Sequence, residues 1–375
     1  MLGLGNSLVS GVVSEQMYSL LLDGTGDYLD IGDNLDLGTA DFSISLWTKF
    51  ADATGSTYLI SKYQSSTYRV AIFLASDDKI QVQVEGDDNS VTNNKGAAVV
   101  TPLENSWVHI VVTCNRDGNI ALYVNGATGT YGFSTSAGSS SQTLNNTASW
   151  IIGAKNDSAD NAFTGNIDEV AIFNTELDST NVTAIRNSGK PFNLNYDRGG
   201  YDQSSALQGY WRMFNGPFDD LANGAVHDAH NPGFGAELTT HGDFNDSTAA
   251  AAAWIEGTGW SFSDSVLKND GSHANSNIYQ RLTTQYKTYK VTFTVTAFTS
   301  GTVKSFHGAP TGYGTNRTAV GTYTDYLLAS SSTDFIGLTG NSFVGEVDNI
   351  SIVQLNGYPG ITAADATFST DTPDD

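Results

Sequence analysis

The chain has 375 residues, in which 17 lysines and arginines oppose 40 aspartates and glutamates, a formal net charge of −23. A surface this acidic repels phosphate backbones and anionic lipid headgroups, which excludes nucleic acid and membrane as main partners. The single cysteine, Cys114, excludes an intramolecular disulfide. At roughly 100–200 residues per domain, the length predicts two or three domains.

The first 17 residues contain neither a basic segment nor a long apolar run, so they predict neither a signal peptide nor a membrane span. Residues 18–22 already supply an opening strand before the Asp23-Gly24 turn. We therefore expect residues 1–17 to be a docking segment that binds a larger assembly, and not a strand of the first domain.

Apolar and polar residues then alternate in several short segments, as in half-buried antiparallel strands. Turn signals separate these segments: Asp117-Gly118 and Asn125-Gly126 are dipeptides that favour hairpin turns with positive φ. One helix is predicted near residues 178–187, between Asp178 and a stop at Gly189. Three alternating segments illustrate the strand pattern: residues 42–46, 80–84 and 289–295.

The alternation lapses between residues 193 and 231 and then resumes. We therefore predict an all-β protein with two antiparallel β-sandwich (jelly-roll) domains in tandem. The tail after Tyr358 has no period and ends in acidic residues, so it would be a solvated peptide unless a neighbour ordered it. The predicted parts are the docking segment 1–17, a sandwich at 18–194, a connector at 195–230, a second sandwich at 231–358 and an acidic tail at 359–375.

Each half ends in a similar strand, at residues 165–172 and 345–352, and each strand carries an aspartate, Asp168 or Asp348. Alternation predicts that each aspartate shares the buried face with the following Val and Ile residues. A buried carboxylate needs a cation, a basic side chain or N–H donors. Two interpretations stay open: a Ca²⁺ ligand, since this chain has few basic residues, or an aspartate that caps a turn.

Five segments occur in an order that resembles the laminin G-like, concanavalin A-like lectin/glucanase superfamily. The resemblance covers roughly residues 18–194 and implies two antiparallel sheets with a structural calcium between the first and last strands. It makes Asp23 and Asp168 the calcium ligand candidates. The segments are residues 21–29, 41–47, 107–113, 122–126 and 165–173.

The second half, roughly residues 231–356, resembles carbohydrate-binding-module-type jelly rolls found on tailed-phage virion proteins. The resemblance rests on an aromatic segment around Trp254 and Trp260, on residues 286–295 and on residues 343–352. Similar modules hold calcium through an aspartate of the last strand, here Asp348. Together the two resemblances imply a minor structural protein of a tailed phage.

Catalysis is not expected. Glycosidases of this superfamily need two carboxylates that flank the scissile bond. Glu346-Val347-Asp348 is the closest match to their signature, but Asn349, Ile350 and Ser351 follow where the second glutamate should stand. No nucleophile elbow or phosphate-binding loop occurs either.

Two weaker groups of candidates are histidines and tyrosines. His227 and His230, with His241, have a spacing that could serve a metal, but an interface or solvated pair is the favoured interpretation. Sugar binding needs exposed aromatic rings. The candidate rings are Tyr58, Tyr63, Tyr68, Tyr313, Tyr323 and Tyr326.

We therefore expect a non-catalytic structural component of a tailed-phage virion, as a head decoration, fibre or tail appendage. The expected partners are other virion proteins, further copies of the chain and a cell-surface glycan, with no nucleic acid and no membrane. The expected cofactor is structural Ca²⁺, and the expected location is the extracellular particle. The alternative is a secreted or surface polysaccharide-binding adhesin of a bacterium.

Overall fold

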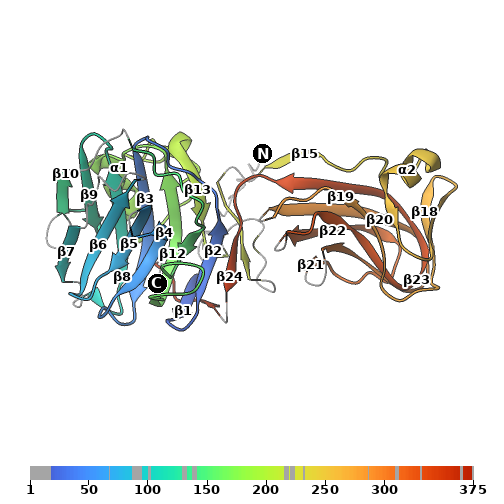
Figure 1. The fold of residues 1–375 in the computed structure, drawn as a ribbon, viewed down its shortest axis with the longest axis horizontal. Coiled ribbons are helices and arrows are strands. Elements are labelled where there is room, and N and C mark those ends of the chain that lie inside the picture. Colours follow the sequence, from blue (N-terminus) through green and yellow to red (C-terminus); the bar gives the residue numbers. More distant parts are fainter. Residues whose placement is uncertain are drawn as a thin grey trace, which may run out of the picture.

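The computed structural model describes residues 18–66, 68–86, 95–99, 103–128, 133–136, 142–214, 219, 224–230, 233–285, 287–308, 312–329, 332–363 and 366–373. The docking segment predicted at residues 1–17 lies outside these residues and stays a prediction. Two β-rich bodies make up the described chain (Figure 1).

The first body is a sandwich of two eight-stranded sheets. One sheet has the order β10-β9-β8-β3-β12-β1-β25, with β13 also paired to β12. Its strands are β1 (Ser19–Asp23), β3 (Phe42–Phe50), β8 (Trp107–Cys114), β9 (Asn119–Val124), β10 (Phe133–Ser136), β12 (Thr164–Phe173), β13 (Leu207–Trp211) and β25 (Thr367–Ser369).

The facing sheet has the order β14-β24-β2-β11-β4-β5-β6-β7. A large apolar core separates the two sheets and includes Phe42, Ile44 and Leu46 from β3 and Trp150 from β11. The strands of this second sheet are β2 (Tyr28–Gly32), β4 (Thr57–Ser65), β5 (Tyr68–Leu74), β6 (Lys79–Glu85), β7 (Lys95–Val99), β11 (Trp150–Ile152), β14 (Ala225–Val226) and β24 (Gly360–Ala363).

The predicted hairpin and helix of the first sandwich are confirmed. The Asp117-Gly118 turn joins β8 to β9, where the N–H of Asn115 donates to the carbonyl of Asn119 at 2.9 Å. Helix α1 (Ser179–Arg186) begins at Asp178, whose carboxylate accepts the N–H of Asn181. The chain after β12 covers the outer face of the sheet, so Ser43 and Ser45 of β3 are buried as well and the strand is not half-buried as predicted.

The second body is one nine-stranded sheet wrapped around its own core. Register shifts interrupt the pairing of its two longest strands, and bulges of this kind bend strands, so one sheet can close into a sandwich. Its helix α2 (Ser247–Ala253) was missed, although Asp246 followed by an alanine run is a helix start signal. The strands are β15 (Phe234–Glu237), β16 (Ile255–Glu256), β17 (Trp260–Ser263), β18 (Val266–Asp270), β19 (Ser276–Arg281), β20 (Thr288–His307), β21 (Gly312–Tyr313), β22 (Gly321–Leu328) and β23 (Phe335–Leu355).

The second sandwich is an insertion into the first one. After β23 the chain returns to the first sandwich, where β24 pairs with β2 and with β14, and β25 pairs with β1. Figure 1 shows this return: β24, in red, lies beside β2, in blue. The predicted tandem order and the separate connector 195–230 are therefore wrong, because β13 and β14 of that connector belong to the sheets of the first sandwich.

The acidic tail 359–375 is a structural part of the first sandwich and not a solvated peptide. The Asp371 carboxylate contacts the Lys49 ammonium at 2.5 Å and accepts the indole N–H of Trp107 at 2.8 Å. The Ser19 hydroxyl donates to the carbonyl of Asp371 at 2.7 Å. The neighbour that the tail needed is thus the opening strand of its own chain.

Candidate functional site

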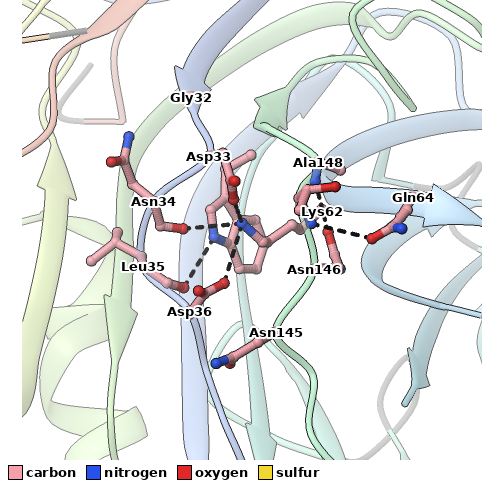
Figure 2. A network of polar contacts seen from close by, with 12 residues as sticks. Gly32, Asp33, Asn34, Leu35, Asp36, Lys62, Gln64, Asn145, Asn146 and Ala148 are labelled. Atoms are coloured by element: carbon pink, nitrogen blue, oxygen red, sulfur yellow. Dashed lines mark hydrogen bonds and ion pairs between the residues drawn. The ribbon is translucent and has the colours of Figure 1, made fainter. Parts of the chain in front are cut away.

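A buried lysine holds the loop that follows β2. The Lys62 side chain is only 2 % exposed, and its ammonium lies 2.7 Å from the Asp33 carboxylate and 3.5 Å from the Asp36 carboxylate. It also donates to the carbonyl of Asn34 at 3.3 Å (Figure 2). A buried ammonium requires such partners, so the loop is drawn over the end of β4.

Further hydrogen bonds fix both sides of this loop. The indole N–H of Trp150 donates to the carbonyl of Leu35 at 3.2 Å, and Leu35 has a positive φ of 50°. The side-chain carbonyl of Asn145 accepts the N–H of Gly38 at 2.6 Å. Asp41, at the end of the loop, accepts the N–H of Arg116 at 2.7 Å. The acidic side chains of the loop are thus presented by a braced backbone.

A pocket of 620 Å³ opens beside this loop. We call it the junction pocket, because Tyr358, where the chain returns from the inserted sandwich, forms part of its wall. Among the residues that the structure describes, no lysine or arginine lines it, whereas three carboxylates do. The lining residues are Asp33, Asn34, Leu35, Asp36, Leu37, Ala40, Asp41, Ile172, Asn174, Gln208 and Tyr358.

Tyr358 is held by both sandwiches. Its carbonyl accepts the indole N–H of Trp211 at 2.8 Å, and its N–H donates to the Asp228 carboxylate at 3.2 Å. From the inserted sandwich, the Lys287 ammonium lies 3.9 Å from the centre of its ring. The pocket wall is therefore shared between the two bodies.

Asp228 is the buried polar centre of the junction. Besides Tyr358, the N–H groups of Tyr210 and His230 donate to its carboxylate, each at 2.8 Å. The N–H donors and the charge of Lys287 lower the pKa of Asp228. Burial has the larger effect and raises this pKa to about 8. Burial also lowers the pKa of Lys287 below its ordinary value.

The predicted calcium ligands of the first sandwich are not brought together. Asp23 pairs with Thr164 across the β1–β12 ladder, so Asp168 lies four residues further along β12, roughly 13 Å away. The exposed Asp23 carboxylate accepts the N–H of Thr25. Within the described ranges, no three acidic, histidine or cysteine side chains cluster as a metal site. The pair does not fit one ion, and calcium at Asp168 stays a prediction.

Asp168 and Asp348 sit in equivalent β-bulges. Each carboxylate accepts the N–H of the next residue at 2.7 Å, and those residues, Glu169 and Asn349, have positive φ angles of 48° and 53°. The predicted facing was therefore wrong. The bulge moves the aspartate off the face of the following apolar residues, as the core membership of Ile167 together with Val170 shows.

The two bulges differ in their surroundings. Asp168 is fully buried, and the Glu169 carboxylate beside it lies 3.0 Å from the Arg212 guanidinium and accepts the hydroxyl of Tyr210. Asp348 is half-buried and also accepts the side-chain amide of its neighbour Asn349 at 3.1 Å. The capping role left open by the sequence is present at both sites.

The histidine and glutamate candidates lie apart from the junction pocket. His227 is buried, and its backbone N–H donates to the Asp219 carboxylate. His230 is half-buried at the junction. His241 lies in the inserted sandwich, in a turn with a φ of 53°. Glu346 contacts the Lys268 ammonium at 3.4 Å.

The predicted sugar-stacking tyrosines are mostly engaged. Tyr58 is 7 % exposed and stacks on Phe73, and Tyr63 lies under Lys155. Tyr313 is 44 % exposed, with the Lys304 ammonium 4.0 Å from its ring centre. Tyr358, which does line a pocket, was missed, because a single tyrosine beside Gly357 and Pro359 resembles an ordinary linker.

Comparison with known proteins supports the fold. A family model described as the concanavalin A-like lectin/glucanases superfamily matches residues 23–183, less than half of the chain. No curated protein matches the sequence. Among the described helices, none is long and apolar enough to cross a membrane.

Several solved structures are similar to this chain at low sequence identity. A carbohydrate-binding module of the Ruminococcus gnavus IT-sialidase, bound to α2,3-sialyllactose, is 10 % identical, with coverage of 39 % of this chain and 82 % of that one and a TM-score of 0.33. A native heptameric pentraxin from Limulus polyphemus is 15 % identical, with coverage of 46 % of this chain and 82 % of that one and a TM-score of 0.37. Domain 4 of an arabinanase from Geobacillus stearothermophilus, in complex with arabinotriose, is 17 % identical. The match covers 44 % of this chain and 75 % of that one, with a TM-score of 0.32.

The family match agrees with the two facing antiparallel sheets and with their order. Residues 23–183 of this chain have the concanavalin A-like lectin fold.

Proposed function

We propose that this protein binds a polysaccharide, without cleaving it, through the junction pocket. The observation that carries the proposal is the composition of this pocket. Carboxylates and side-chain amides, together with the aromatic residue Tyr358, line a pocket of 620 Å³. Carboxylates and amides bond sugar hydroxyls, and an aromatic ring covers the apolar face of a pyranose.

The charge of the pocket favours a neutral glycan. Asp33, Asp36 and Asp41 line it, and among the described residues the ammonium that contacts Asp33 and Asp36 is the buried one of Lys62. The chain as a whole carries a formal charge of −23. A polyanionic glycan would be repelled both by the carboxylates of the pocket and by the net negative charge of the chain.

Binding without cleavage follows from the roles of the carboxylates. A glycosidase needs one carboxyl group as acid and a second as base or nucleophile. Asp33 and Asp36 contact the same ammonium and brace the loop, and Asp41 accepts a backbone N–H. We assign these groups to binding and loop structure.

The experiment is a glycan array on the purified protein, followed by calorimetry with each hit. Tyr358→Ala and Asp36→Asn should weaken binding by tenfold or more, since the first removes the aromatic ring and the second replaces a charged hydrogen-bond acceptor by a neutral amide. Asp77→Asn is the matched control, because Asp77 is an exposed aspartate that contacts Lys79 and Gln81 in the turn between β5 and β6 and does not line the pocket. Equal affinity for all variants, or no hit on the array, would contradict the proposal.

We place this binder on the particle of a tailed phage, as a structural component that contacts other virion proteins and further copies of itself. The support is the resemblance of the second sandwich to modules of such particles, in a chain that also carries a laminin G-like sandwich. The alternative is an adhesin on or outside a bacterial cell. Mass spectrometry of purified particles and of the cell surface separates the two, and light scattering gives the oligomeric state.

Calcium is proposed only as a stabilising ion at Asp168 or Asp348. An ion that binds only the folded state would stabilise that state by about 2.7 kcal/mol when the free calcium concentration is a hundredfold above the dissociation constant. Melting in a chelator and in millimolar calcium tests this, and identical curves would leave the carboxylates with their capping role alone.

A further inference from the structure

Lys287 joins the inserted sandwich to the wall of the junction pocket. It lies at the start of β20, and its carbonyl accepts the N–H of Ala329, which belongs to the same sandwich. Its ammonium reaches the returning chain, where it donates to the carbonyl of Gly357 at 3.2 Å and lies 3.9 Å from the centre of the Tyr358 ring. One side chain thus contacts both the backbone and the ring.

Asp228 holds the same segment from the first sandwich. Its carboxylate accepts the N–H of Tyr358. Gly357 has a φ of +89°, and a Cβ added there would come within 2.8 Å of Asp228. Only glycine lets the chain pass this close to the carboxylate with that φ. The position of Tyr358 is therefore set by Asp228 and Trp211 of the first sandwich and by Lys287 of the inserted one.

We propose that Lys287, a residue of the inserted sandwich, positions Tyr358 in the wall of the junction pocket and thereby sets the affinity of that pocket for glycan. This inference rests on the proposed function for its ligand. Lys287 does not line the pocket, so it acts through Tyr358 as a positioning residue. By reciprocity, a glycan that contacts the Tyr358 ring stabilises the docking of the inserted sandwich.

The test compares two lysines of the same strand region. Lys287→Met keeps the aliphatic stem and removes the ammonium, and Lys287→Arg restores a cation that can lie over the ring. Lys290→Met is the matched control, since the Lys290 ammonium lies 4.8 Å from the ring centre of Phe234 and contacts no pocket residue among those described.

The first readout needs no ligand: hydrogen exchange of the peptide that spans residues 356–363, with melting temperature as a measure of overall stability. We expect faster exchange of this peptide in Lys287→Met, near wild-type exchange in Lys287→Arg, and no change in Lys290→Met. Equal exchange in the two methionine variants would overturn the positioning role.

The second readout is calorimetry with three neutral probes: chitohexaose, xylohexaose and maltohexaose. For any probe that the wild type binds, Lys287→Met should weaken binding by about three- to tenfold, as expected for loss of one cation–π contact, and Lys287→Arg should recover most of it. Unchanged affinity would overturn the inference and leave the proposed function intact. If the wild type binds no probe, the proposed function and the affinity claim fail together, whereas the exchange data still decide whether Lys287 positions Tyr358.

Discussion

The first sandwich is assembled from two separate parts of the chain, whereas the inserted sandwich is built from one continuous stretch. Ser19 and Asp371 bond to each other although they lie 352 residues apart in sequence. The inserted sandwich begins and ends at one point, where the N–H of Asn356 donates to the carbonyl of Gly233 at 2.9 Å. An insertion with adjacent ends disturbs its host least, which is why a second body can interrupt the first without opening its core.

The largest expected effect comes from removing residues 358–375. The first sandwich then loses β24, β25 and the partners of Lys49, Trp107 and Trp211. We expect a loss on the order of 5 kcal/mol or more, enough to unfold a typical domain, while the inserted sandwich keeps its own transition. Calorimetry of the truncated protein measures both transitions.

Excision of residues 234–355, with the ends joined by a short glycine linker, is the control. The first sandwich should still fold, because both of its strand sets remain. A truncated chain whose first sandwich melts like the wild type, or an excised chain that fails to fold, would refute the insertion as the organising feature.

A pH effect is expected next, at the junction between the two bodies. The folded pKa of Asp228 is raised to about 8, so the folded state holds a proton that the unfolded state loses near pH 4. This contribution to stability is fully present below about pH 4 and is lost as the pH rises through about 8. Between pH 6.5 and 8.5 the free energy of unfolding should fall, by up to about 1.4 kcal/mol per pH unit.

Asp228→Asn should flatten this dependence, because the amide cannot ionise. Urea unfolding at several pH values between 6.5 and 8.5 measures the slope in both proteins. A wild-type slope equal to that of the variant would show that the three N–H donors, and not burial, control this carboxylate.

The two bulges give a smaller and sharper comparison. Asp168 and Asp348 make the same bond to the next N–H, but Asp168 is fully buried and Asp348 is half-buried. We expect Asp168→Asn to cost about 1–3 kcal/mol and Asp348→Asn to cost less than about 1 kcal/mol, since solvent replaces part of the lost bond. Denaturant titration of each variant tests the difference, and equal costs would mean that the bulge geometry alone matters.

The smallest effect is expected for the ion pair between Lys49 and Asp371. Their side chains are 24 % and 37 % exposed. Partly exposed pairs contribute about 0.2–1 kcal/mol, so Lys49→Met should change stability little and should lose even that difference in high salt. A cost of several kcal/mol would show that the tail depends on this pair more than on its strand pairing.

The sequence by itself determined the all-β class, the lectin-like fold of the first sandwich, the approximate extent of the second and the main hairpin and helix. These features depend on local patterns: alternation over five or more residues, Asp-Gly turns and a capping aspartate. The motif shared by residues 165–172 and 345–352 also marked a real structural feature, although its physical meaning was a bulge and not an uninterrupted strand.

Only the tertiary structure decided that the chain returns to close its first sandwich and that Tyr358 lines a pocket. β14, β24 and β25 have two to four residues each, too few for alternation to be recognised, and their stability comes from pairing with strands more than 100 residues away. Asp33, Asp36, Lys62 and Tyr358 likewise carry no local signal. They meet because the facing strands and the returning chain bring them together, which is a property of the fold and not of any one segment.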